Sequence, residues 1–223
     1  MLSRCANTSI MLHMGLQGRR INKLQQRILD SMLSNDYVFI NTHNTNRGRG
    51  ISTIIANYLL WEISVYYNIS NLLIVPNNHH YAYSKDMYET AYMYLRNDLA
   101  RTRGSNIISN EYNKTMLEWE TMSSVYRGYR IPYDINTICI DDPCGAMTDD
   151  NFYRIQADIA SLRHRKLNKP SYMPYDGMYE ANALDRITVT EEVVPRLVII
   201  SPYAYSIMKR TMSNYHSVDY IDA

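Results

Sequence analysis

Four short apolar runs, separated by helix-patterned segments, constrain the fold of this chain more than any other feature of its sequence. The runs are rich in Val, Ile and Leu, as strands buried on both faces are, and they lie at residues 37–40, 72–75, 137–140 and 197–200. The pattern predicts helices at residues 21–33, 52–67, 83–99, 149–167 and 203–213, and a hairpin formed by residues 106–108 and 116–119. Because buried strands that alternate with helices are joined by crossovers, we predict an α/β fold with a largely parallel sheet and helices on both faces.

Composition excludes several classes of protein. The chain has 223 residues, 46% of them hydrophobic, which suits one generous domain or two small ones. Lys and Arg number 23 and Asp and Glu number 22, so any charged binding site must be local. No apolar run is long enough for a membrane span, residues 1–14 lack the apolar core of a signal peptide, and three cysteines do not suggest a disulfide framework. We therefore expect neither a secreted, nor a membrane-embedded, nor a disordered protein.

A glycine-rich loop follows the first predicted strand and opens the next helix. It reads Asn-Arg-Gly-Arg-Gly-Ile-Ser-Thr over residues 46–53. Backbone N–H groups in such a loop approach phosphates closely, and the helix N-terminus adds partial positive charge. A complete Walker A loop has Lys directly before the Ser or Thr, and here that position is Ile51. Taken alone, the loop is better described as a glycine turn between a strand and a helix.

Two adjacent acids follow the third apolar run, in the form of a Walker B element. In this interpretation Asp141 and the Ser52 hydroxyl hold Mg²⁺, and Asp142 orients or deprotonates the attacking water. Open α/β sheets bind ligands at the carboxyl ends of their strands, which would place Gly48, Gly50 and both acids on one edge. The plainer alternative is a capped loop at a strand end.

The order of these motifs resembles the ATPase domain of the large terminase subunits of tailed bacteriophages, the viral DNA-packaging motors. The similarity extends from about Lys23 to about Met212 and rests on Gln26, Arg47–Thr53, Leu72–Pro76, Arg127–Gly128, Ile138–Asp142 and Val198–Pro202. It implies a P-loop NTPase-like fold of the ASCE type, with ATP and Mg²⁺ as cofactors.

The resemblance also implies roles for individual residues. Gln26 would contact adenine, Arg47 would act catalytically on the γ-phosphate beside Asp142, and Ser201 with Pro202 would couple hydrolysis to movement. The ATP-binding set would be Gln26, Arg47, Gly48, Arg49, Gly50, Ser52 and Thr53. Arg49 is the candidate substitute for the missing lysine, although a forked guanidinium would change the geometry. Asp142 stands where the family commonly has Glu.

The domain prediction is an N-terminal arm at residues 1–20, an ATPase-like domain at 21–213 and a C-terminal tail at 214–223, without a nuclease domain. The family resemblance implies double-stranded DNA, a capsid portal and a small terminase subunit as partners, and a homo-oligomeric ring when docked. It also implies a place in the host-cell cytoplasm and transiently at the procapsid portal vertex, with no membrane partner. A local basic cluster is the candidate DNA contact and comprises Arg163, Arg165, Lys166 and Lys169.

Three functions remain open from the sequence. The first is an active packaging ATPase. The second is a helicase-like ATPase, which would need a second motor domain. The third is a nucleotide-binding, catalytically weak scaffolding subunit, which Ile51 favours and the retained Asp141-Asp142 pair disfavours.

Overall fold

The computed structural model of the chain describes most of a single α/β unit. The described residues are 20–43, 49–66, 69–76, 85–86, 88, 100–103, 106–110, 114–127, 131, 135–142, 145, 147–162, 167–168, 190–191, 195–202, 215 and 217–223.

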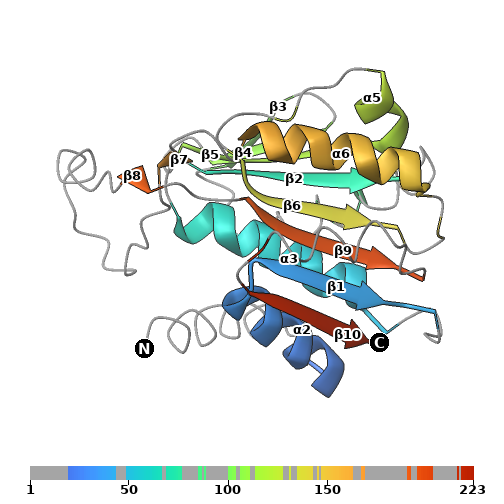
Figure 1. Cartoon of the computed structure of the whole chain (residues 1–223). Helices are drawn as coiled ribbons and strands as arrows, with labels where there is room; N and C mark the ends of the chain where they lie inside the picture. Colours follow the sequence, from blue (N-terminus) through green and yellow to red (C-terminus); the bar gives the residue numbers. More distant parts are fainter. Residues whose placement is uncertain are drawn as a thin grey trace.

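An eight-stranded sheet forms the centre of the described structure (Figure 1). Its order is β10-β1-β9-β6-β2-β5-β4-β3. The strands are β1 (Tyr37–Asn41), β2 (Ser70–Val75), β3 (Ala100–Arg103), β4 (Ile107–Asn110), β5 (Thr115–Thr121), β6 (Ile135–Asp141), β9 (Arg196–Ser201) and β10 (Val218–Asp222). Two short strands, β7 (Leu167–Asn168) and β8 (Thr190–Glu191), pair separately.

The sheet is parallel from β10 to β5 and antiparallel only at the β4 and β3 edge. All four predicted apolar runs are parallel strands, and the predicted hairpin is the antiparallel pair of β4 and β5. Strand β9 lies between β1 and β6, and its Ile200 is paired with Ile40 on one side and Asp141 on the other. The glycine loop and the acid pair therefore follow strands that are separated by one strand.

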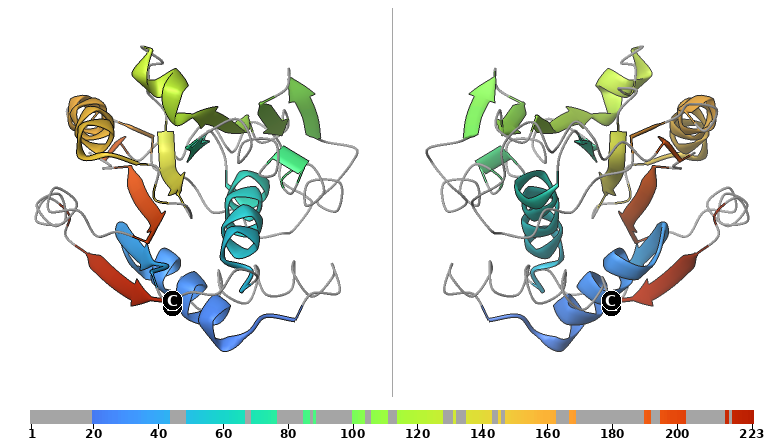
Figure 2. Two further views of the ribbon diagram at one scale, coloured as in Figure 1. Left: turned by 90° about the vertical axis from the view of Figure 1, so that its right-hand side faces the viewer. Right: turned by 90° about the vertical axis from the view of Figure 1, so that its left-hand side faces the viewer.

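Helices cover both faces of the sheet, as predicted (Figure 2). Helices α2 (Lys23–Ser34) and α3 (Ile51–Val65) pack on the face that carries Val38, Val198 and Cys139. Helices α5 (Met122–Tyr126) and α6 (Asp149–Leu162) pack on the face that carries Phe39, Ile199 and Ile138. Successive strand residues point to opposite faces, so each apolar run supplies both cores.

The last strand corrects the prediction of a C-terminal tail at residues 214–223. Strand β10 pairs in parallel with β1 and belongs to the same sheet. Arg27 of α2 forms an ion pair with Asp219 at 2.7 Å, and Asn41 donates a hydrogen bond to Asp222 at 2.9 Å. Only Ile221 of this strand is buried, so its sequence lacks the apolar run that identified the other parallel strands.

Some predicted features fall outside the described residues. These are most of the helix at 83–99, the helix at 203–213 and residues 163–166 of the helix predicted at 149–167. The last residue predicted in that helix, Leu167, lies in strand β7 instead. No helix among the described residues has the length and apolar character needed to cross a membrane.

Candidate nucleotide site

The carboxyl ends of the parallel strands meet the start of α3 at one edge of the sheet. Asp141 ends β6, Ser201 ends β9, and Thr42 directly follows β1. The N–H of Thr42 donates to the carbonyl of Ser201 at 3.0 Å, so the ends of these neighbouring strands are held together. This is the edge at which open α/β sheets bind ligands.

The two predicted magnesium ligands lie together at this edge. The Ser52 side chain forms a hydrogen bond with the Asp141 carboxylate, which is buried with 4% exposure. The Oδ1 atom of Asp141 is fully buried and has no hydrogen-bond partner among the described residues. Burial raises the pKa of Asp141 to about 6; the hydrogen bond from Ser52 opposes this rise, and the charge of Asp142 adds to it.

This donor set fits a hard divalent cation. Mg²⁺ prefers oxygen ligands and binds through one or two carboxylates while keeping several waters and substrate phosphates. A buried carboxylate with an unpartnered oxygen, next to a hydroxyl, supplies such ligands, and the cation would supply the charge that burial has left uncompensated. The described residues hold no group of three or more His, Cys, Asp or Glu side chains suited to a metal, so any ion here needs further ligands from its substrate or from water.

The start of α3 is arranged as an anion site. Gly50 precedes the helix with φ of 73°, in the left-handed region that glycine adopts without strain. The N–H of Ile54 donates to the carbonyl of Gly50 at 3.0 Å, which closes the first turn. The N–H groups of residues 51–53 therefore have no carbonyl partner within the helix, as expected for a first turn, and the helix dipole favours an anion there.

Gln25 is the glutamine that lies against the glycine loop, whereas the sequence singled out Gln26. The Gln25 side chain donates to the carbonyl of Gly50 at 3.1 Å and accepts from the N–H of Asn22 at 3.0 Å. A Cβ added to Gly50 would lie 2.4 Å from Nε2 of Gln25. Gln26 instead donates to Asp30 at 2.9 Å on its own helix. The signal that identifies Gln25 is the capping box that it forms with Asn22 at the start of α2.

Ile51, in the position of the Walker A lysine, faces the hydrophobic core. Its side chain is 8% exposed and belongs to the core cluster under α2 and α3. This explains why an isoleucine is accommodated there: the position contributes apolar packing and no charge. Arg49, the predicted substitute, is exposed, and its carbonyl accepts a hydrogen bond from Asn22 at 3.4 Å. Arg47 and Gly48 lie outside the described residues.

Asp142 is engaged in building the loop that leads to α6. It is fully buried, and its Oδ2 accepts from the N–H of Met147 at 2.8 Å. Its own N–H donates to Ile200 at 2.9 Å and its carbonyl accepts from Gly145 at 3.3 Å. A water molecule reaches this carboxylate only if the surrounding backbone rearranges, so in the conformation described Asp142 supports the chain before α6 and does not contact solvent.

Ser201 and Pro202, the predicted coupling pair, stand at the same edge. Ser201 is fully buried, and its carbonyl accepts the hydrogen bond from Thr42 described above. Pro202 is half-buried. The Oγ1 atom of Thr42 is buried and has no partner in the described part of the chain. The four basic residues proposed for DNA contact lie outside the described residues.

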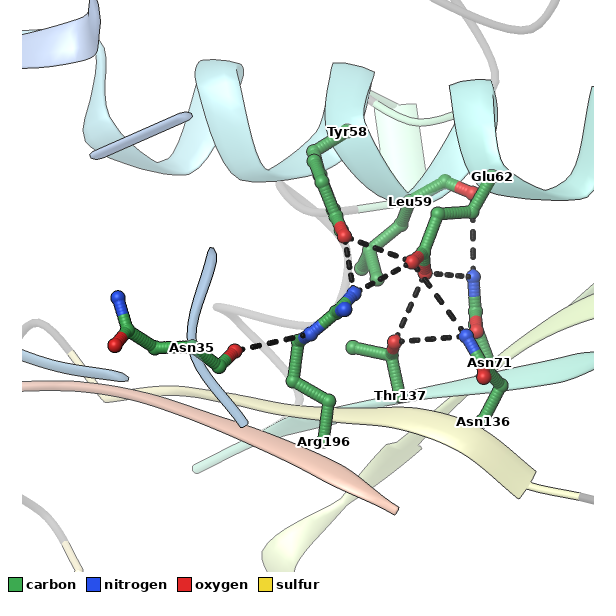
Figure 3. Close-up of polar contacts among 8 residues, drawn as sticks. All are labelled: Asn35, Tyr58, Leu59, Glu62, Asn71, Asn136, Thr137 and Arg196. Atoms are coloured by element: carbon green, nitrogen blue, oxygen red, sulfur yellow. Dashed lines mark hydrogen bonds and ion pairs between the residues drawn. The ribbon is translucent and has the colours of Figure 1, made fainter. Parts of the chain in front are cut away.

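A second buried polar cluster, which sequence reasoning missed, lies near the other end of α3 (Figure 3). We call it the Glu62 network. Both oxygens of Glu62 accept hydrogen bonds: Oε1 from Tyr58 and Arg196, each at 2.8 Å, and Oε2 from Thr137 at 2.9 Å and Asn71 at 3.0 Å. Asn136 adds a contact to Oε1 at 3.5 Å.

Arg196 supplies the positive charge of the Glu62 network. It also donates to the carbonyl of Asn35 at 3.2 Å and to the Tyr58 hydroxyl, and it lies over the Tyr58 ring at 5.9 Å. Burial works to lower the pKa of Arg196, but Tyr58 and Glu62 outweigh it and raise the pKa above its usual value. No sequence signal joins residues that are this far apart along the chain.

Comparison with known proteins places this architecture. No protein-family model and no curated protein matches the chain. Among solved structures, the large terminase ATPase domain of Thermus phage P74-26 is similar with a TM-score of 0.62 and 8% identity, over 94% of this chain and 83% of that one. The HK97 bacteriophage large terminase is similar with a TM-score of 0.52 and 11% identity, over 82% of this chain. The chain spans only 33% of that terminase.

The same fold occurs in a further protein. S. cerevisiae Dbp5 L327V bound to RNA and ADP BeF3 is similar with a TM-score of 0.55 and 10% identity, over 96% of this chain and 49% of that one. The predicted fold class is confirmed: the chain has a terminase-like, P-loop NTPase-like ATPase-domain fold.

Proposed function

We propose that this chain is the ATPase domain of a viral DNA-packaging motor of the large terminase type, which couples ATP hydrolysis to translocation of double-stranded DNA into a capsid. One observation carries the proposal. Ser52 and Asp141, which are remote in sequence, form a hydrogen bond at the ligand-binding edge, and Asp141 keeps a buried oxygen without a partner. In a fold shared with large terminase ATPase domains, this pair suits a magnesium–nucleotide complex.

The remaining roles follow from the geometry around this pair. Bound Mg²⁺ would neutralise charge that develops on the phosphates during transfer. The free N–H groups at the start of α3 would hold phosphate oxygens, and Gln25 would hold Gly50 in the turn that aims them. Asp142 would orient the attacking water after movement of its loop, Arg47 would act on the γ-phosphate, and Gln26 would contact adenine.

A nucleotide-binding scaffold is the second candidate, and two observations favour it. The lysine position is an isoleucine that packs in the core, and Asp142 is fully buried in its loop. Both would allow nucleotide to bind while slowing hydrolysis. The likeness to Dbp5, solved with RNA and an ADP complex, is compatible with the helicase-like alternative.

The proposed partners extend the packaging interpretation. They are double-stranded DNA, through Arg163, Arg165, Lys166 and Lys169, a capsid portal, a small terminase subunit and neighbouring copies in a ring. The proposed location is the cytoplasm of an infected host cell and, transiently, the portal vertex.

The test is ATP turnover by the purified chain with Mg²⁺, alone, with double-stranded DNA and with RNA. Asp142→Asn and Arg49→Ala test the active site, Asp141→Ala tests metal-dependent binding, and Asp150→Asn is the matched control because Asp150 is exposed on α6. Turnover that DNA stimulates and Asp142→Asn abolishes supports the motor. Mg²⁺-dependent binding without turnover supports the scaffold, stimulation by RNA alone supports the helicase-like function, and the absence of both binding and turnover overturns the proposal.

A further inference from the structure

The apolar side chains of helix α3 do not by themselves determine the position of the helix along its own axis on the sheet. Its residues Ile54, Ile55, Leu59, Leu60 and Ile63 are each at most 1% exposed. The helix packs under α2 and against β2, β4 and β5, so apolar side chains contact it on several sides. Hydrophobic attraction is non-directional, so this packing holds the helix on the sheet more firmly than it sets its axial position.

Two polar contacts tie α3 to the same strand, one near each end of the helix. At the start, Ser52 meets Asp141 at the end of β6. Near the other end, Glu62 accepts a hydrogen bond from Thr137 in the first half of β6, at 2.9 Å. About 15 Å of helix separates Ser52 from Glu62 at 1.5 Å per residue, and about 13 Å of strand separates Thr137 from Asp141 at 3.3 Å per residue. The two contacts therefore match in spacing and fix one axial position of α3 on β6.

The contact near the end of α3 is the stronger of the two by its hydrogen bonds and its charge. Glu62 receives bonds from β2, β6 and β9, and Arg196 neutralises its charge at 2.8 Å. A shift of α3 along the sheet would break these bonds together and separate the Glu62 carboxylate from the Arg196 guanidinium in the core. By contrast, the pair of Ser52 and Asp141 is a single hydrogen bond that a modest shift would open.

We propose that Glu62 and Arg196 are positioning residues for the nucleotide site: their network sets the axial position of α3 on β6 and so holds Ser52 against Asp141. The inference rests on the proposed function for the identity of the ligand, magnesium–nucleotide. It does not rest on that function for the mechanical link between the two ends of α3.

Replacing a buried ion pair by apolar or neutral groups often leaves stability nearly unchanged, because desolvation offsets most of the attraction. A variant that removes both charges can therefore test whether Glu62 and Arg196 position α3 without a large loss of stability. The double variant Glu62→Gln/Arg196→Met removes both charges together and keeps an amide at position 62 that still accepts a hydrogen bond. Ser64→Ala is the matched control on the same helix, since the Ser64 hydroxyl donates to the carbonyl of Leu60 within α3, at 2.7 Å, and Ser64 is outside the Glu62 network.

The first measurement is the affinity for Mn²⁺ with a fluorescent ATP analogue, beside urea unfolding of the same proteins. We expect the double variant to remain folded and cooperative and to lose about tenfold in metal-dependent affinity, the scale of change seen when a supporting group behind a metal ligand is removed. Ser64→Ala should keep wild-type affinity. Unchanged affinity in the folded double variant would overturn the inference.

The second measurement is hydrogen exchange of the α3 amides without nucleotide. We expect faster exchange of the Ile54 N–H, whose bond to Gly50 closes the first turn, with little change in the strands. If the wild-type chain binds no nucleotide, the proposed function fails, while exchange still decides the mechanical link. If the double variant does not fold, Thr137→Val removes the Glu62 contact to β6 alone and should give the same change in exchange at a smaller size; wild-type exchange there would overturn the inference.

Discussion

Two buried carboxylates on the same face of the sheet differ in how they are satisfied. Glu62 is 1% exposed and accepts hydrogen bonds on both oxygens, with Arg196 at 2.8 Å. Asp141 is 4% exposed, is bonded to Ser52, keeps one buried oxygen without a partner, and has a second carboxylate as its neighbour. The first lies beside the early residues of the strands and the second at their carboxyl ends, and about 13 Å of strand β6 separates the two levels.

The difference separates a structural charge from a binding charge. A buried carboxylate is retained without loss of stability only when donors and a counter-charge surround it, and Glu62 has both. Asp141 has an incomplete set, and its pKa of about 6 reflects that burial. The missing donor and counter-charge destabilise the ionised Asp141 carboxylate in the metal-free protein. They favour cation binding, because a bound cation would supply the positive charge.

The largest expected effect is on stability, at Glu62. Glu62→Gln leaves Arg196 in the core without its counter-charge, and breaking a buried pair in this way costs about 3–5 kcal/mol. The lower end applies, because the Arg196 side chain is 23% exposed. Urea unfolding measures the change, and Glu62→Gln/Arg196→Met should recover a large part of the loss. A single variant as stable as the wild type would contradict the structural role of this carboxylate.

The second effect is the pH dependence of stability in the metal-free protein. Folded Asp141 holds its proton up to about pH 6, whereas the unfolded chain releases it near 3.8. The group therefore stabilises the folded state at low pH, and this contribution is lost as pH rises from about 4 to about 6. At 1.36 kcal/mol per pH unit the full contribution is about 3 kcal/mol.

The measurement is urea unfolding in EDTA across this range, for the wild type and for Asp141→Asn. The variant should gain stability relative to the wild type as pH rises, because an amide has no charge to bury. A difference that stays constant with pH would show that Asp141 is not held protonated, and would remove this contrast between the two carboxylates.

The third effect is on metal-dependent binding at Asp141. Asp141→Asn removes the charged ligand that the proposed magnesium site needs, so affinity for magnesium–nucleotide should fall about 100-fold, which corresponds to about 2.7 kcal/mol. Affinity for nucleotide in EDTA should change little. Asp150→Asn, on exposed surface, is the control; equal losses with and without Mg²⁺ would indicate that Asp141 acts on the fold rather than on the metal.

The fold was predictable from the sequence for those strands that are buried on both faces of the sheet. The four apolar runs became β1, β2, β6 and β9 because a central parallel strand is covered on both faces and must be apolar throughout. Strand β10 was missed because it is an edge strand with only Ile221 buried, and its two acids are satisfied by Arg27 and Asn41 from elsewhere in the chain. The local pattern of apolar and polar residues does not reveal partners that are remote in sequence.

The site was predictable in part, for a similar reason. Topology alone placed Asp141 beside the start of α3, because parallel strands end at one edge. The Glu62 network was invisible, since it joins α3 to residues as distant as Arg196. The choice between Gln25 and Gln26 depends on which side of α2 faces the glycine turn, and the cap at Asn22 sets that rotation.

The smallest expected effect is at the start of α3, where the neutral side chain of Gln25 supports the turn at Gly50. Gln25→Ala removes the bond to Gly50 and half of the capping box, and cap losses cost about 1 kcal/mol. The freed turn should weaken nucleotide binding by about fivefold, close to the same free energy. Gln26→Ala is the matched control for the turn, because Gln26 bonds to Asp30 on its own helix.

Parallel binding titrations with ATP and with inorganic triphosphate decide between the two glutamines. A loss for both ligands in Gln25→Ala indicates that Gln25 supports the phosphate turn, because triphosphate has no base. A loss for ATP alone in Gln26→Ala would support the adenine contact proposed from the family resemblance. If Gln25→Ala kept full affinity for triphosphate, the left-handed backbone of Gly50 and the Asn22 bond to Arg49 would be enough to hold the turn. The hydrogen bond from Gln25 to Gly50 would then contribute to stability and not to phosphate binding.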